Sequence, residues 1–98
     1  MTLGEAIRRI RKKRELTQQD LATESGLSLS YINQIENGTD NTMPADKAIR
    51  KIATALNFPA EALAFLSLNK SDVDPDKIEA FEMVKMPIDA MIEKFFLQ

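Results

Sequence analysis

Apolar residues recur every three or four positions through most of the 98-residue chain, and this spacing predicts helices rather than strands. Five short helices are expected before residue 67, over residues 3–14, 18–25 and 29–37, then from Pro44 and from Pro59. The positions expected to face inward are Leu3, Ile7, Ile10, Leu21, Ala22, Ile32, Ile35, Ala48, Ile49, Ile52, Ala53, Leu56, Leu63 and Leu66. Five helices around one apolar core make an all-α domain.

Polar residues and glycines stand where helix caps are needed, namely Thr2 with Glu5, Thr17 with Asp20, Gly26, Ser28 and Gly38. A threonine answered three residues later by an acidic side chain has the spacing of a capping box, and glycine suits the end of a helix. The segment from residue 17 to residue 38 therefore predicts two helices joined by one glycine turn.

A second apolar pattern lies beyond a polar segment that runs from Ser67 to Asp74. The expected boundary divides the chain into a domain at residues 1–69 and a C-terminal helical extension at residues 70–98. The apolar stripe of this extension consists of Ile78, Phe81, Val84, Ile88, Met91, Ile92 and Phe95. Such a stripe needs a cover, and two alternatives remain: the extension pairs with a second copy to make a homodimer, or it folds back on its own domain.

Pro87 interrupts the helical pattern of the extension. Proline lacks a backbone N–H and disfavours helical geometry in the preceding residue, here Met86. We therefore expect either a kink or two short helices hinged at this point.

Composition argues against an enzyme, because the chain contains neither cysteine nor histidine. These absences remove disulfides, thiolate metal sites and the commonest general base, so no catalytic residue, metal or cofactor is expected. No apolar run approaches the length of a membrane span, and no signal peptide is evident. A cytoplasmic protein without membrane contact is expected.

Charge is unevenly distributed, although the net charge is only −2. Residues 1–59 contain nine Lys and Arg against seven Asp and Glu, whereas residues 60–98 contain four against eight. The dense basic run comprises Arg8, Arg9, Arg11, Lys12, Lys13 and Arg14. The first half is thus the part suited to approach a polyanion.

The segment Leu16 to Gly38 resembles the phage repressor and Cro family, the XRE family, of helix-turn-helix proteins. The resemblance depends on Thr17-Gln18 at the start of the second helix and on Glu36-Asn37-Gly38 after the third, and it spans roughly residues 3–66. It implies a lambda-repressor-like fold of five helices. It also implies a sequence-specific transcriptional regulator, expected to be a repressor, that binds an inverted repeat of double-stranded DNA as a dimer.

The resemblance implies a set of DNA-binding residues: Gln18, Ser28, Leu29, Ser30, Tyr31, Asn33, Gln34 and Asn37. Gln18 and Asn37 are the expected neutral phosphate contacts, and Gln34 is the leading base reader because its amide suits adenine. Tyr31 either contacts phosphate or packs between helices. The resemblance further implies a structural pair between Arg11 and Glu36 that locks the first helix onto the third.

Three positions depart from the family pattern. Glu15 stands where glycine is usual, so a less tight first turn is expected. Ala45 replaces a capping serine or threonine before the fourth helix. The loop at residues 39–42 contains no lysine or arginine to contact the DNA backbone, which predicts a lower affinity for each DNA half-site.

A different class of function also fits the sequence. The chain could act chiefly as a protein-interaction module, such as an antitoxin that holds a toxin through its apolar extension and represses its own operon. The gene next to this one distinguishes the two readings, because an antitoxin gene adjoins that of its toxin.

Overall fold

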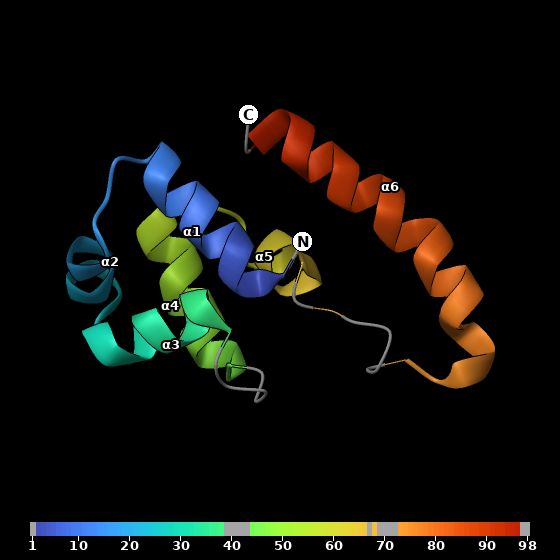
Figure 1. Cartoon of the computed structure of the whole chain (residues 1–98), viewed down its shortest axis with the longest axis horizontal. Coiled ribbons are helices and arrows are strands. Elements are labelled where there is room, and N and C mark those ends of the chain that lie inside the picture. The colour runs from blue at the N-terminus through green and yellow to red at the C-terminus, as the bar shows by residue number, and fades with distance from the viewer. Residues whose placement is uncertain (1, 39–43, 67, 69–72, 97–98) are drawn as a thin grey trace. The chain divides into compact units, whose positions relative to one another are not determined.

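Every element of the computed structural model is a helix within the residues it describes, which are 2–38, 44–66, 68 and 73–96. The chain divides into two compact units, residues 1–67 and 68–98. The first unit contains α1 (Leu3–Lys13), α2 (Gln18–Ser25), α3 (Leu29–Asn37), α4 (Asp46–Leu56) and α5 (Ala60–Leu66), as Figure 1 shows. The second contains a 3₁₀ turn, η2 (Pro75–Lys77), followed by α6 (Ile78–Phe96). The expected all-α class, a five-helix domain with a helical extension, is confirmed.

The core of the first unit forms where the inward faces of its helices meet. Helix α1 packs on α3 and α5, α2 packs on α3 and α4, and α4 packs on α5. The buried apolar residues are Ala6, Ile7, Ile10, Leu21, Ala22, Ile32, Ile49, Ile52, Ala53, Leu56, Phe58, Leu63 and Leu66. Each large aliphatic side chain among them contributes about 1.5–3 kcal/mol by leaving water. Leu3, Ile35 and Ala48 are only half-buried.

The expected caps are present at the N-termini of the first three helices. Both capping boxes form, Thr2 with Glu5 and Thr17 with Asp20. The backbone N–H and hydroxyl of Thr17 bond the Asp20 carboxylate and lower its pKa. The hydrogen bonds stabilise the folded state only while the Asp20 carboxylate is ionised. This stabilisation is therefore fully present at pH values above the ordinary pKa of aspartate, and it is lost as the pH falls through the lowered pKa of Asp20.

Gly4 permits the close approach of α1 to α3. A Cβ atom at this position would overlap the carbonyl oxygen of Ile35 and lie 2.9 Å from that of Glu36. These atoms belong to the α3 backbone, which cannot move aside as a flexible side chain can. The missing side chain thus sets how near the start of α1 lies to the last turn of α3.

The turn after α1 is tight, so the expectation of a loose turn at Glu15 is wrong. The N–H of Leu16 donates to the carbonyl of Arg11 and that of Glu15 to Lys12, both at 3.0 Å. This pair of bonds is the Schellman arrangement that usually needs glycine. Glu15 adopts the left-handed backbone that this turn requires, with φ 59°. Because glutamate has a Cβ atom and glycine has none, its backbone is strained in this conformation.

Helix α4 begins later than the sequence predicts. Pro44 was expected in its first turn, but the helix starts at Asp46, so Pro44 lies outside it. Ala45 is the N-cap and provides no side-chain hydrogen bond, as its side chain implies. The loop at residues 39–42 lies outside the described residues.

Helix α6 continues through Pro87 as one helix, so of the two alternatives the pair of short hinged helices is wrong, and the kink stays a prediction. Pro87 cannot donate to the carbonyl of Met83, which costs one hydrogen bond of the helix. Lys85 donates to both carboxylate oxygens of Asp89 at 2.8 Å, and this pair bridges the turn that contains the proline. One local bond is lost while the turns on either side remain joined.

Glu15→Gly is expected to stabilise the first unit. Removing the left-handed strain should raise the free energy of unfolding by about 1–2 kcal/mol. The greater conformational freedom of glycine in the unfolded chain should lower it by about 0.5–1 kcal/mol, which leaves a net gain. Thermal melts should show a rise of a few degrees. Glu24→Gly, which places glycine inside α2, is the control and should lower the melting temperature. A Glu15→Gly protein that melts at or below the wild-type temperature would disprove strain at this turn.

Candidate nucleic-acid interface

Helices α2 and α3 form the expected helix-turn-helix, joined at Gly26 with φ 74°. Ile32 and Glu36 point into the core from α3, and Ile35 is half-buried. The opposite side of α3 carries a continuous exposed arc consisting of Leu29, Ser30, Asn33, Gln34 and Asn37. The same helix therefore anchors one side in the core and offers the other to solvent.

An ion pair between Arg11 and Glu36 lies beneath this arc. The guanidinium Nε and Nη2 atoms donate to the two carboxylate oxygens at 2.8 and 3.0 Å, and Nη1 donates to the Leu16 carbonyl at 2.8 Å. The Glu36 side chain has no solvent exposure, and that of Arg11 has 10%. The structure thus contains the pair that the resemblance implies, and it fixes α1 against α3.

Three side-chain amides continue from Glu36 across the surface, and we call Gln18, Asn33 and Asn37 the amide chain. Gln18 Nε2 donates to Glu36 Oε1 at 3.2 Å, and Gln18 Oε1 accepts from Asn33 Nδ2 at 3.3 Å. Asn33 Oδ1 accepts from Asn37 Nδ2 at 2.9 Å, and Asn37 Oδ1 accepts from Arg8 Nη2 at 3.0 Å. The amide chain thus runs from a guanidinium to a carboxylate, each amide donating to the next.

The remaining predicted side chains are not part of this chain. Ser28 caps α3, its hydroxyl accepting from the Tyr31 N–H at 3.1 Å, and the Tyr31 side chain is half-buried. Gln34 and Ser30 are exposed, and their side chains make no hydrogen bond to any residue in the described part of the chain. Leu29 is 43% exposed.

Sequence reasoning missed the roles of two arginines in the basic run. Arg8 holds one end of the amide chain and lies 3.6 Å from Glu36 Oε1. Arg14 donates to the carbonyls of Leu56 and Asn57 at 3.0 and 3.4 Å, and thereby caps the C-terminus of α4. No signal in the sequence separates these two from their neighbours, since each depends on a partner at least 28 positions away.

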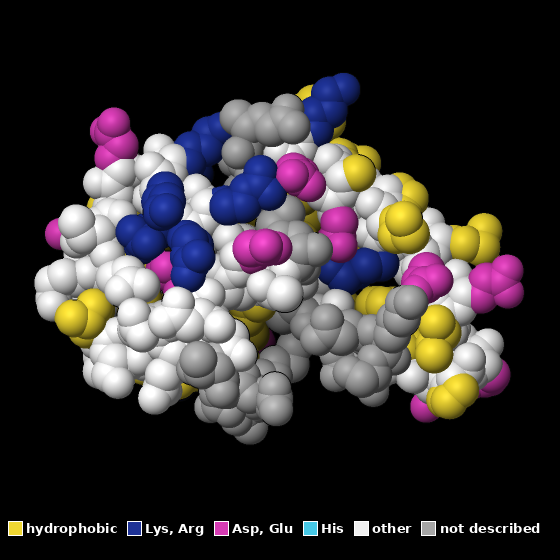
Figure 2. Space-filling model, in the orientation of Figure 1, with side chains coloured by type: hydrophobic (Ala, Val, Ile, Leu, Met, Phe, Trp, Pro, Cys, Tyr) yellow, Lys and Arg dark blue, Asp and Glu magenta, His cyan; other side chains and the backbone are white. Residues whose placement is uncertain are grey.

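Figure 2 shows dark blue Lys and Arg side chains gathered over α1. This surface is positive although the whole chain carries a net charge of −2. The described residues include no group of acidic, histidine or cysteine side chains arranged to hold a metal ion.

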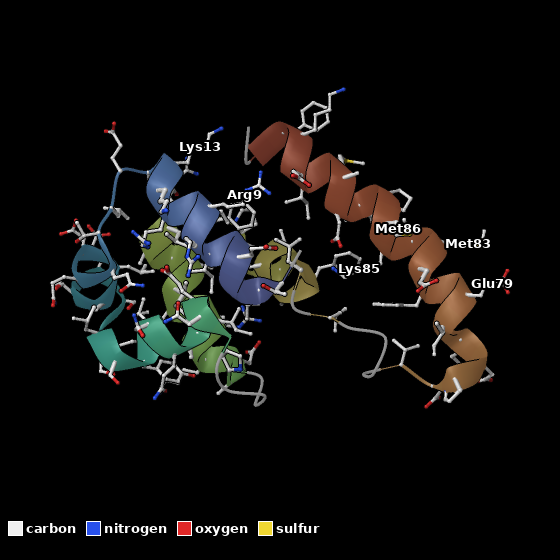
Figure 3. The ribbon with its side chains drawn as sticks, viewed as in Figure 1. Arg9, Lys13, Glu79, Met83, Lys85 and Met86 are labelled. Carbon is white, nitrogen blue, oxygen red and sulfur yellow. The ribbon has the colours of Figure 1, made fainter. Side chains whose placement is uncertain are left out.

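All seven residues of the apolar stripe lie on α6, and three of them are strongly exposed: Val84 at 54%, Met91 at 55% and Phe95 at 69%. Met83 and Met86, which the stripe does not include, are exposed at 72% and 69%. Figure 2 shows yellow side chains along this helix, and in Figure 3 Met83 and Lys85 project from opposite sides of it. Helix α6 is therefore apolar over more of its surface than the stripe alone predicts.

Comparison with known proteins identifies a family model and several relatives. The model described as helix-turn-helix matches residues 7–63. The HTH-type transcriptional repressor RghR of Bacillus subtilis is 42% identical over 64 residues, covering 65% of this chain and 47% of its own length. The immunity repressor protein of Bacillus phage phi105 is 40% identical over 63 residues, covering 64% and 42%. This chain thus spans less than half the length of these two relatives.

A third relative matches over a longer range. The competence pilus inhibition repressor of Acinetobacter baylyi is 33% identical over 91 residues, covering 93% of this chain and 78% of its own length. A match of that length includes part of α6. No solved structure matches the chain significantly. Among the described helices, none has the length and hydrophobicity that crossing a membrane requires.

Arg11→Ala is expected to lower the free energy of unfolding by roughly 3 kcal/mol, because it leaves the Glu36 carboxylate buried without its bidentate partner. Lys12→Ala is the matched control, since Lys12 is exposed on the same helix and should change stability by less than about 0.5 kcal/mol. Urea unfolding measures both. Equal midpoints for the two variants would show that the ion pair contributes nothing to folding.

Proposed function

The chain belongs to the XRE-type helix-turn-helix family, and we propose that it is a DNA-binding transcriptional regulator, a repressor that binds an inverted repeat as a symmetric dimer. The exposed arc of α3 carries this proposal. Its leucine, hydroxyl and amide side chains are the kinds that contact thymine methyl groups and base edges in the major groove. Relatives named as repressors support the direction of regulation.

Two kinds of contact divide the residues of the interface. Leu29 at the start of α3 and Gln34 in its middle are both exposed and are proposed to read bases, with Ser30 beside Leu29. Gln18 and Asn37 are proposed to hold phosphate, and the half-buried Tyr31 lies at the border of the arc. This division follows the hydrogen bonds, because Gln18 and Asn37 are held in the amide chain, whereas a base reader must extend freely into the groove.

Dimerisation is proposed to occur through α6. Five residues of the apolar stripe are spaced alternately by three and four positions, which is the repeat of paired helices: Phe81, Val84, Ile88, Met91 and Phe95. The exposed side chains would each contribute about 1.5–3 kcal/mol on burial, before the cost of ordering. A relative whose match extends into α6 indicates that this helix accompanies the DNA-binding unit in another repressor.

A second candidate function, a module that captures another protein, is favoured by one observation. Met83 and Met86 are exposed outside the stripe, and unbranched methionine side chains suit adaptable binding surfaces. A homodimer that uses the stripe would leave this second apolar surface available. The two functions are compatible in one chain.

Sequencing of genomic fragments retained by the purified full chain tests the proposed function. The bound fragments should share an inverted repeat whose half-site centres lie about 34 Å apart, one turn of DNA. Fragments without two-fold symmetry, bound by a protein that stays monomeric on DNA, would contradict it.

Gln34→Ala is expected to reduce discrimination at one base pair in each half-site by about 1–3 kcal/mol, because it removes a bidentate amide. Gln18→Ala should instead weaken selected and random DNA alike, as loss of a phosphate contact does. Titration of each variant with both duplexes measures the difference. Equal losses on both duplexes for both variants would show that the proposed division of roles is wrong.

Truncation after Asn69 is expected to leave a folded, monomeric unit with much weaker binding to the selected duplex. Light scattering gives the oligomeric state and a thermal melt gives the stability. If the extension only folds back on its own unit, truncation should lower the melting temperature without changing the mass. An unchanged dimer would rule out dimerisation through α6.

Met91→Glu in the full chain locates the dimer surface more finely. Met91 belongs to the stripe, so a charge there should dissociate the dimer. Met86→Glu is the matched control, because it replaces another exposed methionine of α6 that lies outside the stripe. This variant should remain dimeric. The reverse result would place the contact on the surface of Met83 and Met86.

A further inference from the structure

The amide chain keeps a hydrogen-bond donor available on each of its three side chains. Each of its carbonyl oxygens accepts one hydrogen bond, and each NH₂ group uses one of its two hydrogens. The second hydrogen of each amide finds no acceptor within the described part of the chain. Three remaining donors from two helices form a surface whose chemistry suits an anion.

We infer that Gln18, Asn33 and Asn37 together form one neutral phosphate-binding surface, and that Arg8 and Glu36 fix the direction of its donors. The inference rests on the proposed DNA binding and deepens it. It assigns Asn33, which the family resemblance includes among the DNA-binding residues, to the backbone contacts. It also makes the three amides a single unit rather than separate side chains.

The two charged ends determine the orientation of every amide between them. A guanidinium has only donors, so Asn37 must turn its oxygen toward Arg8. A carboxylate has only acceptors, so Gln18 must turn its nitrogen toward Glu36. Asn33 lies between a donor and an acceptor and has one orientation that satisfies both. No amide can reverse without setting two like groups against each other.

Charge near the surface is also favourable for a phosphodiester. The carboxylate of Glu36 is fully buried and bonded at both oxygens by Arg11, so its negative charge is neutralised before it reaches the surface. Arg8 is 41% exposed in its side chain and remains at the other end as a cation. The donors therefore lie beside a net positive charge, which strengthens hydrogen bonds to an anion.

Asn33→Ala tests the inference in the full chain, with a 20-base-pair duplex of random sequence and the duplex selected from genomic DNA. Binding to both should weaken by the same factor of about ten, the factor that one good hydrogen bond to a charged group supplies. Asn33→Asp should weaken both further, because its carboxylate cannot donate and would force Gln18 to turn its oxygen toward Glu36. Fluorescence anisotropy measures affinity, and thermal melts verify that each variant is folded.

Gln19→Ala and Gln19→Glu are the matched controls. Gln19 is an exposed amide on α2 that bonds only Thr23 of its own helix, at 3.2 Å, and so lies outside the amide chain. Both variants should bind within about twofold of wild type. Loss of selectivity at one base pair in Asn33→Ala, with random DNA unaffected, would overturn the inference, as would unchanged binding to both duplexes. A wild-type chain that binds neither duplex would instead refute the proposed function itself.

Discussion

The buried ion pair of Arg11 and Glu36 is the interaction on which the arrangement of the first unit depends. It holds α1 against α3 at the place where Gly4 brings their backbones together. A buried charge pair contributes little net energy compared with apolar packing, but removing one partner costs several kcal/mol. Because its two partners belong to α1 and α3, it also fixes where these helices meet. The orientation of the surface amides then follows from the carboxylate at the centre of the pair.

This arrangement explains how a chain of net charge −2 can present a surface suited to a polyanion. The acidic surplus lies after residue 59, and the buried carboxylate of Glu36 is paired with Arg11 within the core. Beside the exposed arc of α3, the protein therefore presents the oriented side-chain amides of the amide chain and the guanidinium of Arg8. If the amide chain binds phosphate as proposed, its uncharged donors would offset in part the absence of lysine and arginine from residues 39–42.

Local sequence predicted the helices and caps well, because these depend on residues within one turn of each other. The bounds of α2 and α3 and both capping boxes are as predicted. The errors arose where propensity competed with other forces: Glu15 accepts strain to close its turn, and α6 continues through Pro87 because the turns around it stay bonded. The contacts of Arg8 and Arg14 could not be predicted, since their partners are distant in sequence. The family resemblance includes Asn33 among the DNA-binding residues, but only the side-chain geometry connects it to Gln18.

The neutral character of the amide chain bears on how the protein would respond to ionic strength. Each lysine or arginine that contacts phosphate displaces condensed counterions, and the affinity then falls with roughly the 0.9 power of salt concentration for every phosphate neutralised. A contact from an uncharged amide displaces no counterion and adds nothing to the salt dependence of the affinity. An interface held largely by Gln18, Asn33 and Asn37 would keep its affinity as salt rises, with Arg8 as the main source of any dependence. Such a regulator would keep its site at ionic strengths that release more basic binders.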